Sequence, residues 1–139
     1  MELFPEINQR KTVNNAKRFF KYQFPKMQIQ ASINSLSIKS PIISDIPSGT
    51  PYGNSSERKN VLMLQRQEDV RNVVKAIKSL PSFEKFILNA VYLEGSQDSD
   101  VALDLDYSTS RYQALKCKAL LDFAVAIEVY GLEIVVYEK

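Results

Sequence analysis

A chain of 139 residues, 45% of them apolar, is long enough for one ordinary domain with an arm but too short for two full domains. No apolar run approaches the roughly 20 residues that span a bilayer, and the N-terminus lacks the basic start and apolar stretch of a secretory signal, so we expect a cytoplasmic protein with no membrane partner. Histidine is absent and Cys117 is the single cysteine, which excludes a disulfide within the chain, a Cys/His zinc site and a histidine-based catalytic triad.

The net charge of +2 is divided unevenly along the chain. Residues 1–60 carry nine Lys or Arg against four Asp or Glu, whereas residues 61–139 carry nine against twelve. The basic first half indicates either an anionic partner or simply the polar face of an amphipathic helix.

Residues 8–30 have the spacing of one amphipathic helix. Apolar side chains recur three and four positions apart with basic residues between them, at Val13, Ala16, Phe20, Phe24 and Met27. Pro25 removes a backbone donor, so we expect a kink or an end near Phe24. We predict that residues 1–31 form a basic helical arm. Either it docks its aromatic stripe on a core or a second subunit, or it contacts DNA or polymerase.

Residues 32–56 have a different character. They contain eight serines, three prolines and two glycines, and they follow neither a helical nor a strand period. Their scattered isoleucines indicate that part of the segment packs on a neighbour. We predict a long, mostly irregular connector, followed by the functional domain at residues 57–139.

Four helices are predicted in this domain, so the expected fold class is all-α. The first begins after a serine cap at Ser55 and Ser56 and runs to Leu80, with its apolar stripe at Val70, Val73, Val74 and Ile77. The second begins at Pro81 and ends at Gly95, with an apolar set at Phe83, Phe86, Ile87, Ala90 and Val91. The third spans about 97–105 and the fourth about 109–129. Residues 132–137 are β-branched and aromatic, which predicts a short C-terminal strand.

The segment from Ser96 to Lys118 follows the helix-turn-helix pattern of a short helix, a tight turn and a longer helix. Ala102 has the small side chain needed where the two helices cross, and Leu105 and Tyr107 would fill the space between them. Asp106 lies in the turn, where glycine is the commonest residue. Aspartate tolerates the left-handed conformation better than most residues, so it is compatible with this turn. An ordinary helical hairpin with a solvated polar face remains the alternative.

The second helix of this motif carries the predicted DNA-binding residues. Ser108 caps it, and its first residues enter the major groove in proteins of this class. Arginine bonds guanine edges and glutamine bonds adenine edges, while Ser, Thr and Lys suit phosphates or bases. The predicted set is Ser108, Thr109, Ser110, Arg111, Gln113, Ala114, Lys116 and Lys118.

The same segments resemble known families. Residues 80–95, with Asp100-Val101-Ala102 and Leu105-Asp106-Tyr107-Ser108, are similar to region four of bacterial sigma factors, which recognises the promoter's upstream hexamer and touches RNA polymerase. The opening Met-Glu-Leu-Phe-Pro-Glu-Ile, residues 52–59 and the closing Tyr-Glu-Lys resemble the ArpU (autolysin regulatory protein) family of phage and prophage late-transcription regulators from Gram-positive bacteria. The resemblance covers nearly the whole chain and implies transcription control of late genes in a bacterial host cell.

Two features depart from the sigma pattern. Asp106 replaces the usual turn glycine, and the third helix and turn are acidic at Asp98, Asp100, Asp104 and Asp106. Carboxylates facing the DNA backbone would repel phosphates. Their helical spacing fits a solvated or protein-facing surface better than a metal site, since no second ligand type accompanies them.

We therefore predict a DNA-binding transcription regulator, an activator of phage or prophage late genes that acts with host RNA polymerase. The alternative is a sigma-like module that binds RNA polymerase or another regulator without reading DNA. The partners would be double-stranded DNA, bacterial RNA polymerase and a second copy in a homodimer, for which the candidate surfaces are the Phe19/Phe20/Phe24 helix and residues 132–137. No catalytic residue, metal or cofactor is expected, and with no phosphate-binding glycine loop the chain is not expected to be an enzyme.

Overall fold

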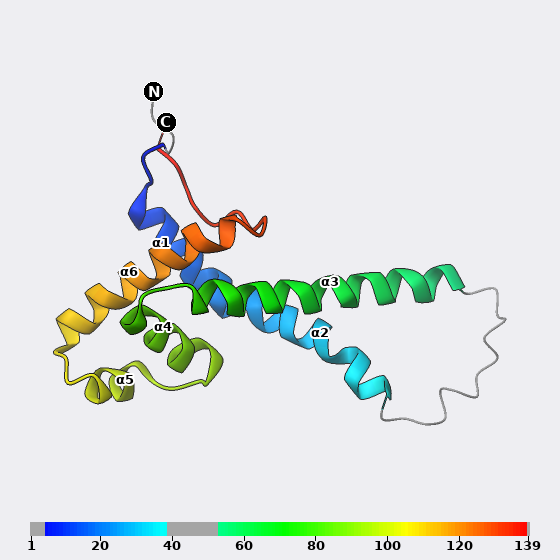
Figure 1. Cartoon of the computed structure of the whole chain (residues 1–139), viewed down its shortest axis with the longest axis horizontal. Coiled ribbons are helices and arrows are strands. Elements are labelled where there is room, and N and C mark those ends of the chain that lie inside the picture. The colour runs from blue at the N-terminus through cyan, green and yellow to red at the C-terminus, as the bar shows by residue number, and fades with distance from the viewer. Residues whose placement is uncertain (1–4, 39–52, 139) are drawn as a thin grey trace. The chain divides into compact units, whose positions relative to one another are not determined.

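A computed structural model describes residues 5–38 and 53–138, without side-chain detail at 33–38 and 53–56. All regular secondary structure in these ranges is helical, which confirms the all-α class (Figure 1). The elements are α1 (Gln9–Arg18), the π-helical η1 (Phe19–Gln23), α2 (Phe24–Ile38), α3 (Gly53–Lys78), α4 (Ser82–Leu88), the π-helical η3 (Asn89–Leu93), α5 (Asp98–Asp104) and α6 (Thr109–Glu128). Among these described helices, none is both long and apolar enough to cross a membrane.

The described residues divide into two compact units. The first contains residues 5–21 and 72–138, and the second contains residues 22–71. The sequence predicted a helical arm at residues 1–31, with docking on a core as one of its alternatives. In the structure α1 packs against α6, so the first part of that arm belongs to the unit that holds the C-terminal helices.

Aromatic packing of η1, which directly follows α1, holds this part of the chain on α6. The ring centroids of Phe19 and Phe20 lie 5.9 and 4.7 Å from that of Phe123 on α6. Phe20 also stacks on Tyr92, with the centroids 4.2 Å apart and the rings 8° from parallel. Both phenylalanines are buried, as is Phe24 in the second unit. These three side chains therefore leave little apolar area exposed for a second subunit, and their burial agrees with the other alternative, docking of the stripe on the chain's own core.

The C-terminal segment is extended but is not a strand. Within the described residues, its only bridge is an isolated antiparallel pair, Ile7 with Tyr137. The buried hydroxyl of Thr12 accepts a hydrogen bond from Val136 N at 2.9 Å, and the Asn15 amide donates to the carbonyl of Ile134 at 3.2 Å. Backbone hydrogen bonds with residues 6–8 and side chains of α1 thus hold this segment, and the two segments lie side by side (Figure 1).

The helix type changes next to Phe24, where the sequence predicted a kink or an end. The π-helical η1 ends at Gln23, and Pro25 occupies the second position of α2. Proline has no N–H to give to the preceding turn, and a π-helical segment is a common way to absorb such a local interruption.

The second unit is built from α2 and the N-terminal part of α3, which run in opposite directions (Figure 1). Arg66 Nε donates to the amide oxygen of Gln30 at 2.9 Å, and Gln67 donates to the carbonyl of Ala31 at 3.1 Å. Both helices extend into the predicted connector, to Ile38 and from Gly53, so the irregular segment was predicted too long. Each serine or asparagine destabilises a helix by only about 0.5 kcal/mol relative to alanine, which is too little to end the helix. Residues 39–52 lie outside the described part of the chain.

Candidate nucleic-acid interface

The end of α5 forms a tight, fully hydrogen-bonded turn. Asp106 N donates to Leu103 O and Tyr107 N donates to Ala102 O, both at 3.0 Å. Asp106 has a φ of 58°, the left-handed conformation predicted for it. This pair of bonds is the Schellman arrangement, in which glycine is the commonest residue at the left-handed position. The turn therefore reverses the chain within a few residues and directs it into α6.

Ser108 then begins α6 as predicted. It has an extended backbone, and its hydroxyl accepts a hydrogen bond from Arg111 N at 3.2 Å. A serine in this position satisfies one of the free donors at a helix start. The first turn of α6 is consequently fixed relative to the turn before it.

One side of α6 packs on α4, η3 and α5. Tyr112 on α6 lies in a buried cluster with Ile87, Ala90 and Val101, and the partly buried Val91, Ala102, Leu105, Tyr107 and Leu115 pack around it. This confirms the predicted inward positions of the α5 and turn residues. A second prediction fails in α4, because Phe83 and Phe86 are 55% and 43% exposed while Leu88 and Glu84 are buried.

The opposite side of α6 is exposed over its first two turns. Ser108, Thr109, Ser110, Arg111, Gln113 and Ala114 are all exposed, and so is Lys118 further along. Lys116 differs from the prediction, since only 11% of its side chain is exposed. The structure thus keeps the predicted set together on one helix but removes Lys116 from its polar face.

Lys116 is buried because it has a partner on α5. Its ammonium group lies 3.0 Å from Oδ2 of Asp98, and the hydroxyl of Tyr112 donates to Oδ1 of the same carboxylate at 2.6 Å. Lys116 also lies over the ring of Tyr92, 5.4 Å from its centroid. The carboxylate links the first residue of α5 to two successive turns of α6, so it fixes the angle between the two helices.

This polar cluster shifts the pKa of its members. Burial alone would raise the pKa of Asp98, but the hydrogen bonds from Tyr112 and Lys116, with the charges of Lys116 and Lys17, lower it below 3.8. Burial and the hydrogen bond to Asp98 raise the pKa of Tyr112. Burial and the Asp98 charge also raise the pKa of Tyr92 to about 12. At neutral pH Asp98 is therefore a carboxylate, and Tyr92 and Tyr112 are neutral phenols.

Arg111 is supported by an aromatic side chain. The carbon of its guanidinium group lies 4.4 Å from the centroid of the Tyr107 ring, and that ring is 6.2 Å from the ring of Phe83. Stacking on the ring holds the planar guanidinium in one orientation, so the side chain loses less conformational freedom when it binds. The sequence placed Tyr107 only as a filler between helices. The spacing of four residues between Tyr107 and Arg111 could have predicted that the tyrosine ring also packs against the guanidinium group.

Lys118 is exposed but has two carboxylate neighbours. Its ammonium group is 2.9 Å from Asp122 and 3.4 Å from Glu84. Burial, followed by the hydrogen bond and charge of Asp122, raises the pKa of Glu84 to about 7. The hydrogen bond with Asp122 in turn raises the pKa of Lys118. Part of the positive charge of Lys118 is therefore offset within the chain.

Helix α1 flanks the middle of α6. A shallow groove of about 470 Å³ lies between them, lined by Gln9, Val13, Ala114, Cys117, Lys118, Leu121 and Asp122. Four basic residues of α1 are exposed, namely Arg10, Lys11, Lys17 and Arg18. In the described residues no group of three or more Cys, Asp or Glu is placed to hold a metal ion.

These features define an all-α protein in which a capped helix, anchored by a buried polar cluster, exposes the polar side of its first two turns. Over 128 residues the chain is 27% identical to the "Putative autolysin regulatory protein ArpU" of Enterococcus hirae, and the match covers 91% of this chain and 93% of that protein. The chain therefore has a distant homologue that is named as a regulatory protein. No family model matches the chain, and no solved structure matches it.

Proposed function

We propose that this chain is a sequence-specific DNA-binding transcription regulator of the ArpU kind, and that α5, its turn and α6 form a helix-turn-helix motif with α6 as the recognition helix. The observation that carries the proposal is the exposure of Thr109, Ser110, Arg111 and Gln113 on a helix whose other side is buried. In this motif the first turns of the second helix enter the major groove.

The side chains on this surface favour recognition of base edges over nonspecific electrostatic attraction to DNA. Arg111 carries a planar set of donors that matches the O6 and N7 edge of guanine, and Gln113 matches the edge of adenine. Three exposed aspartates, Asp100, Asp104 and Asp106, lie nearby on α5 and its turn. They oppose close approach of phosphates to that side, so the DNA backbone would run along α1 rather than α5.

The similarity to a named regulator supports a role in gene regulation over the whole chain. Combined with the sigma-like pattern of residues 80–108, it leads us to propose activation of phage or prophage late genes together with bacterial RNA polymerase. The protein would act in the cytoplasm of the host cell.

Selection of bound fragments from the genome that encodes the chain tests the proposal and gives a cognate duplex. Binding to this duplex and to a scrambled one is then measured by fluorescence anisotropy at two salt concentrations. We expect Arg111→Ala to reduce the free energy of binding to the cognate duplex by about 1–3 kcal/mol, and that to the scrambled duplex by much less. We expect Lys118→Ala to weaken both duplexes alike and to lower the salt slope by less than about one, because Asp122 and Glu84 already offset its charge.

Lys75→Ala is the matched control, since Lys75 is an exposed cation on α3 far from α6 in sequence. It should bind both duplexes like the wild-type chain. If Arg111→Ala weakens both duplexes equally, or neither of them, α6 does not read bases and the proposal is wrong.

A second candidate function is a protein-binding module that contacts RNA polymerase or another regulator without reading DNA. The observation that favours it is the exposure of Phe83, Phe86 and Leu103 in the first unit, the last of them at 77%. Phe83 and Phe86 lie three residues apart on α4 and therefore share one helix face, and clustered exposed apolar side chains are typical of protein-binding surfaces. Phe86→Ser should abolish polymerase capture and leave DNA affinity unchanged if this surface serves that function.

A further inference from the structure

Glu84 on α4 is a buried acidic residue that lies against α6. Only 5% of the residue is exposed, and its Oε2 is 3.4 Å from the ammonium group of Lys118. Its Oε1 is buried and accepts no hydrogen bond from any described residue. A buried carboxylate oxygen without a donor is costly, and this cost falls when the group takes up a proton and becomes neutral. The surroundings of Glu84 therefore favour its neutral form.

The charged groups that face Glu84 come from α6. The ammonium group of Lys118 lies between two carboxyl groups, 2.9 Å from Asp122 and 3.4 Å from Glu84. Glu84 and Asp122 are also close enough to share a hydrogen bond once one of them holds a proton. Helix α4 packs on η3 as well, where the ionisable residue Tyr92 interacts with charges other than Glu84, and Lys85 on α4 itself is exposed. Lys118 and Asp122 therefore set the charge of Glu84, and we name these three residues the Glu84 cluster.

The charge of the Glu84 cluster changes near neutral pH. Burial, with the hydrogen bond and charge of Asp122, raises the pKa of Glu84 to about 7. Below this pH the cluster holds one ammonium group and one carboxylate, and above it a second carboxylate makes the cluster negative. The chain contains no histidine, the side chain that ordinarily titrates in this range. Glu84 is therefore the side chain through which pH can act on α6 between pH 6 and pH 8.

We propose that the Glu84 cluster links DNA binding to the uptake of a proton, so that the chain binds DNA more tightly at pH 6 than at pH 8. The proposal rests on the proposed function, in which Lys118 meets a phosphate. That phosphate would lie about 6 Å from Glu84, which is the 3.4 Å of the Lys118–Glu84 contact plus an ordinary ammonium–phosphate contact of about 2.8 Å. Its negative charge repels a carboxylate but not a neutral acid, so bound DNA favours the protonated form.

Coulomb's law gives the size of the effect. At about 6 Å a unit charge changes the proton affinity of a carboxylate about threefold at the dielectric constant of water, and about tenfold at half that value. With protonation centred near pH 7, binding should be about two- to fivefold tighter at pH 6 than at pH 8. Each bound chain should take up about 0.3–0.4 of a proton at pH 7.

Fluorescence anisotropy with the cognate and the scrambled duplex, at pH 6, 7 and 8 and constant salt, tests the linkage. Phosphates are common to all sequences, so the wild-type chain should show the same two- to fivefold change on both duplexes, to about that size. Calorimetric titration at pH 7 in two buffers of different ionisation enthalpy measures the proton uptake. Binding with equal affinity at pH 6 and pH 8 would overturn this proposal and leave the proposed function intact. No binding to either duplex at any pH would overturn both.

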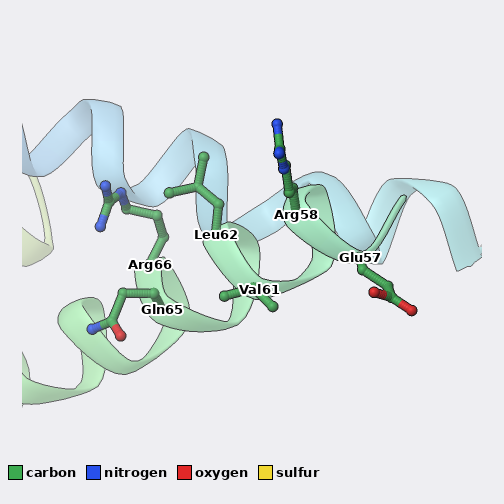
Figure 2. A pocket seen from close by; sticks show the side chains of 6 residues that line it. All are labelled: Glu57, Arg58, Val61, Leu62, Gln65 and Arg66. Carbon is green, nitrogen blue, oxygen red and sulfur yellow. The ribbon is translucent and has the colours of Figure 1, made fainter. Parts of the chain in front are cut away.

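Glu84→Gln tests the assignment to this side chain, because the amide resembles the neutral acid and does not titrate. The variant should bind at pH 8 about as tightly as the wild-type chain binds at pH 6, without proton uptake. Glu57→Gln is the matched control. Glu57 is exposed on α3, where it lines a groove of about 600 Å³, and Figure 2 shows its carboxylate pointing away from Arg58 and Arg66. This control should keep the full pH dependence, and persistence of the pH dependence in Glu84→Gln would contradict the proposal.

Lys118 separates a linkage to DNA from a general effect of pH on folding. Lys118→Ala removes the ammonium group that brings a phosphate close to Glu84, so the pH dependence of binding should become flat. Its free energy of unfolding in urea should still fall as the pH rises, because Glu84 stays buried beside Asp122. Lys118→Arg keeps the cation and should restore the pH dependence of binding. If Lys118→Ala binds DNA with the full pH dependence of the wild-type chain, the effect arises from folding and the proposal is overturned.

Discussion

Asp98 holds α5 on α6, and its replacement by alanine removes the acceptor shared by Tyr112 and Lys116. Tyr112 would lose a hydrogen bond of 2.6 Å and keep a hydroxyl on a residue that is 1% exposed. Lys116 would keep its charge on a side chain that is 11% exposed, without the carboxylate 3.0 Å away.

The expected cost follows from these contacts. A hydrogen bond to a charged acceptor contributes about 1.5–3 kcal/mol, and removing one member of a fully buried ion pair costs about 3–5 kcal/mol. The Asp98 side chain is 40% exposed, so water screens part of the pair and the larger figure does not apply. We expect Asp98→Ala to lower the free energy of unfolding by about 2–4 kcal/mol.

Asp100→Ala is the control, because Asp100 is also in the first turn of α5 but is exposed. Both variants lose the favourable interaction of a carboxylate with the helix N-terminus, about 0.3–1 kcal/mol. The difference between them therefore isolates the cluster. Urea unfolding followed by circular dichroism measures it, with the slope checked for constancy.

The stabilisation that Asp98 provides depends on pH. The pKa of Asp98 in the folded chain lies below its ordinary value of 3.8. Its contribution to the free energy of unfolding is therefore complete above pH 3.8 and is lost as the pH falls towards the folded-state pKa. The difference between Asp98→Ala and the wild-type chain should therefore be constant at neutral pH and shrink below about pH 4. Equal costs for Asp98→Ala and Asp100→Ala would refute the role of the cluster.

Three further comparisons, with five variants, test separate features. Burial raises the pKa of Glu84 from 4.5 to about 7 in the folded chain, so the free energy of unfolding should fall as the pH rises from 4.5 to 7. Glu84→Gln should remove that decline and stabilise the chain above pH 7 by about 1–3 kcal/mol. Urea titrations at several pH values measure both effects. Asp106→Ala should be about 1–2 kcal/mol less stable than Asp106→Gly, because φ is 58° there, and equal melting behaviour would contradict this. Ile87→Ala should cost about 2–5 kcal/mol and the exposed Phe86→Ala much less, and a reversed order would show that the packing of α4 differs.

Local signals made the α5–α6 region predictable. A serine before a polar first turn predicts a cap, and an aspartate in a three-residue turn predicts a left-handed backbone; both predictions are confirmed at Ser108 and Asp106. Val101 and Tyr112 were predicted to be inward from helical spacing, and both are buried. These features depend on residues within about ten positions of one another.

The predictions failed where the burial of a side chain depends on a residue that is distant in the sequence. Lysine is assumed to be solvated, so the burial of Lys116 could be predicted only with knowledge that Asp98 lies opposite it. Helix α4 is apolar around most of its circumference, so spacing alone could not show that Ile87 and Leu88 are inside while Phe83 is outside. The aromatic stripe at Phe20 and Phe24 was recognised, but spacing cannot distinguish a chain's own core from a second copy.

The charges on α6 and α1 predict how DNA binding responds to salt. Among the cations on α6, Lys116 is buried against Asp98 and Lys118 is partly offset by Asp122, so Arg111 and the exposed cations of α1 supply most of the charge towards DNA. Each phosphate contact contributes about −0.9 to the slope of log affinity against log salt. The slope should therefore be shallow, and replacing an exposed cation of α1, as in Lys11→Ala, should reduce it by about one on the cognate and the scrambled duplex alike. An unchanged slope in Lys11→Ala, and in the corresponding Arg10, Lys17 and Arg18 variants, would show that the DNA backbone does not run along α1.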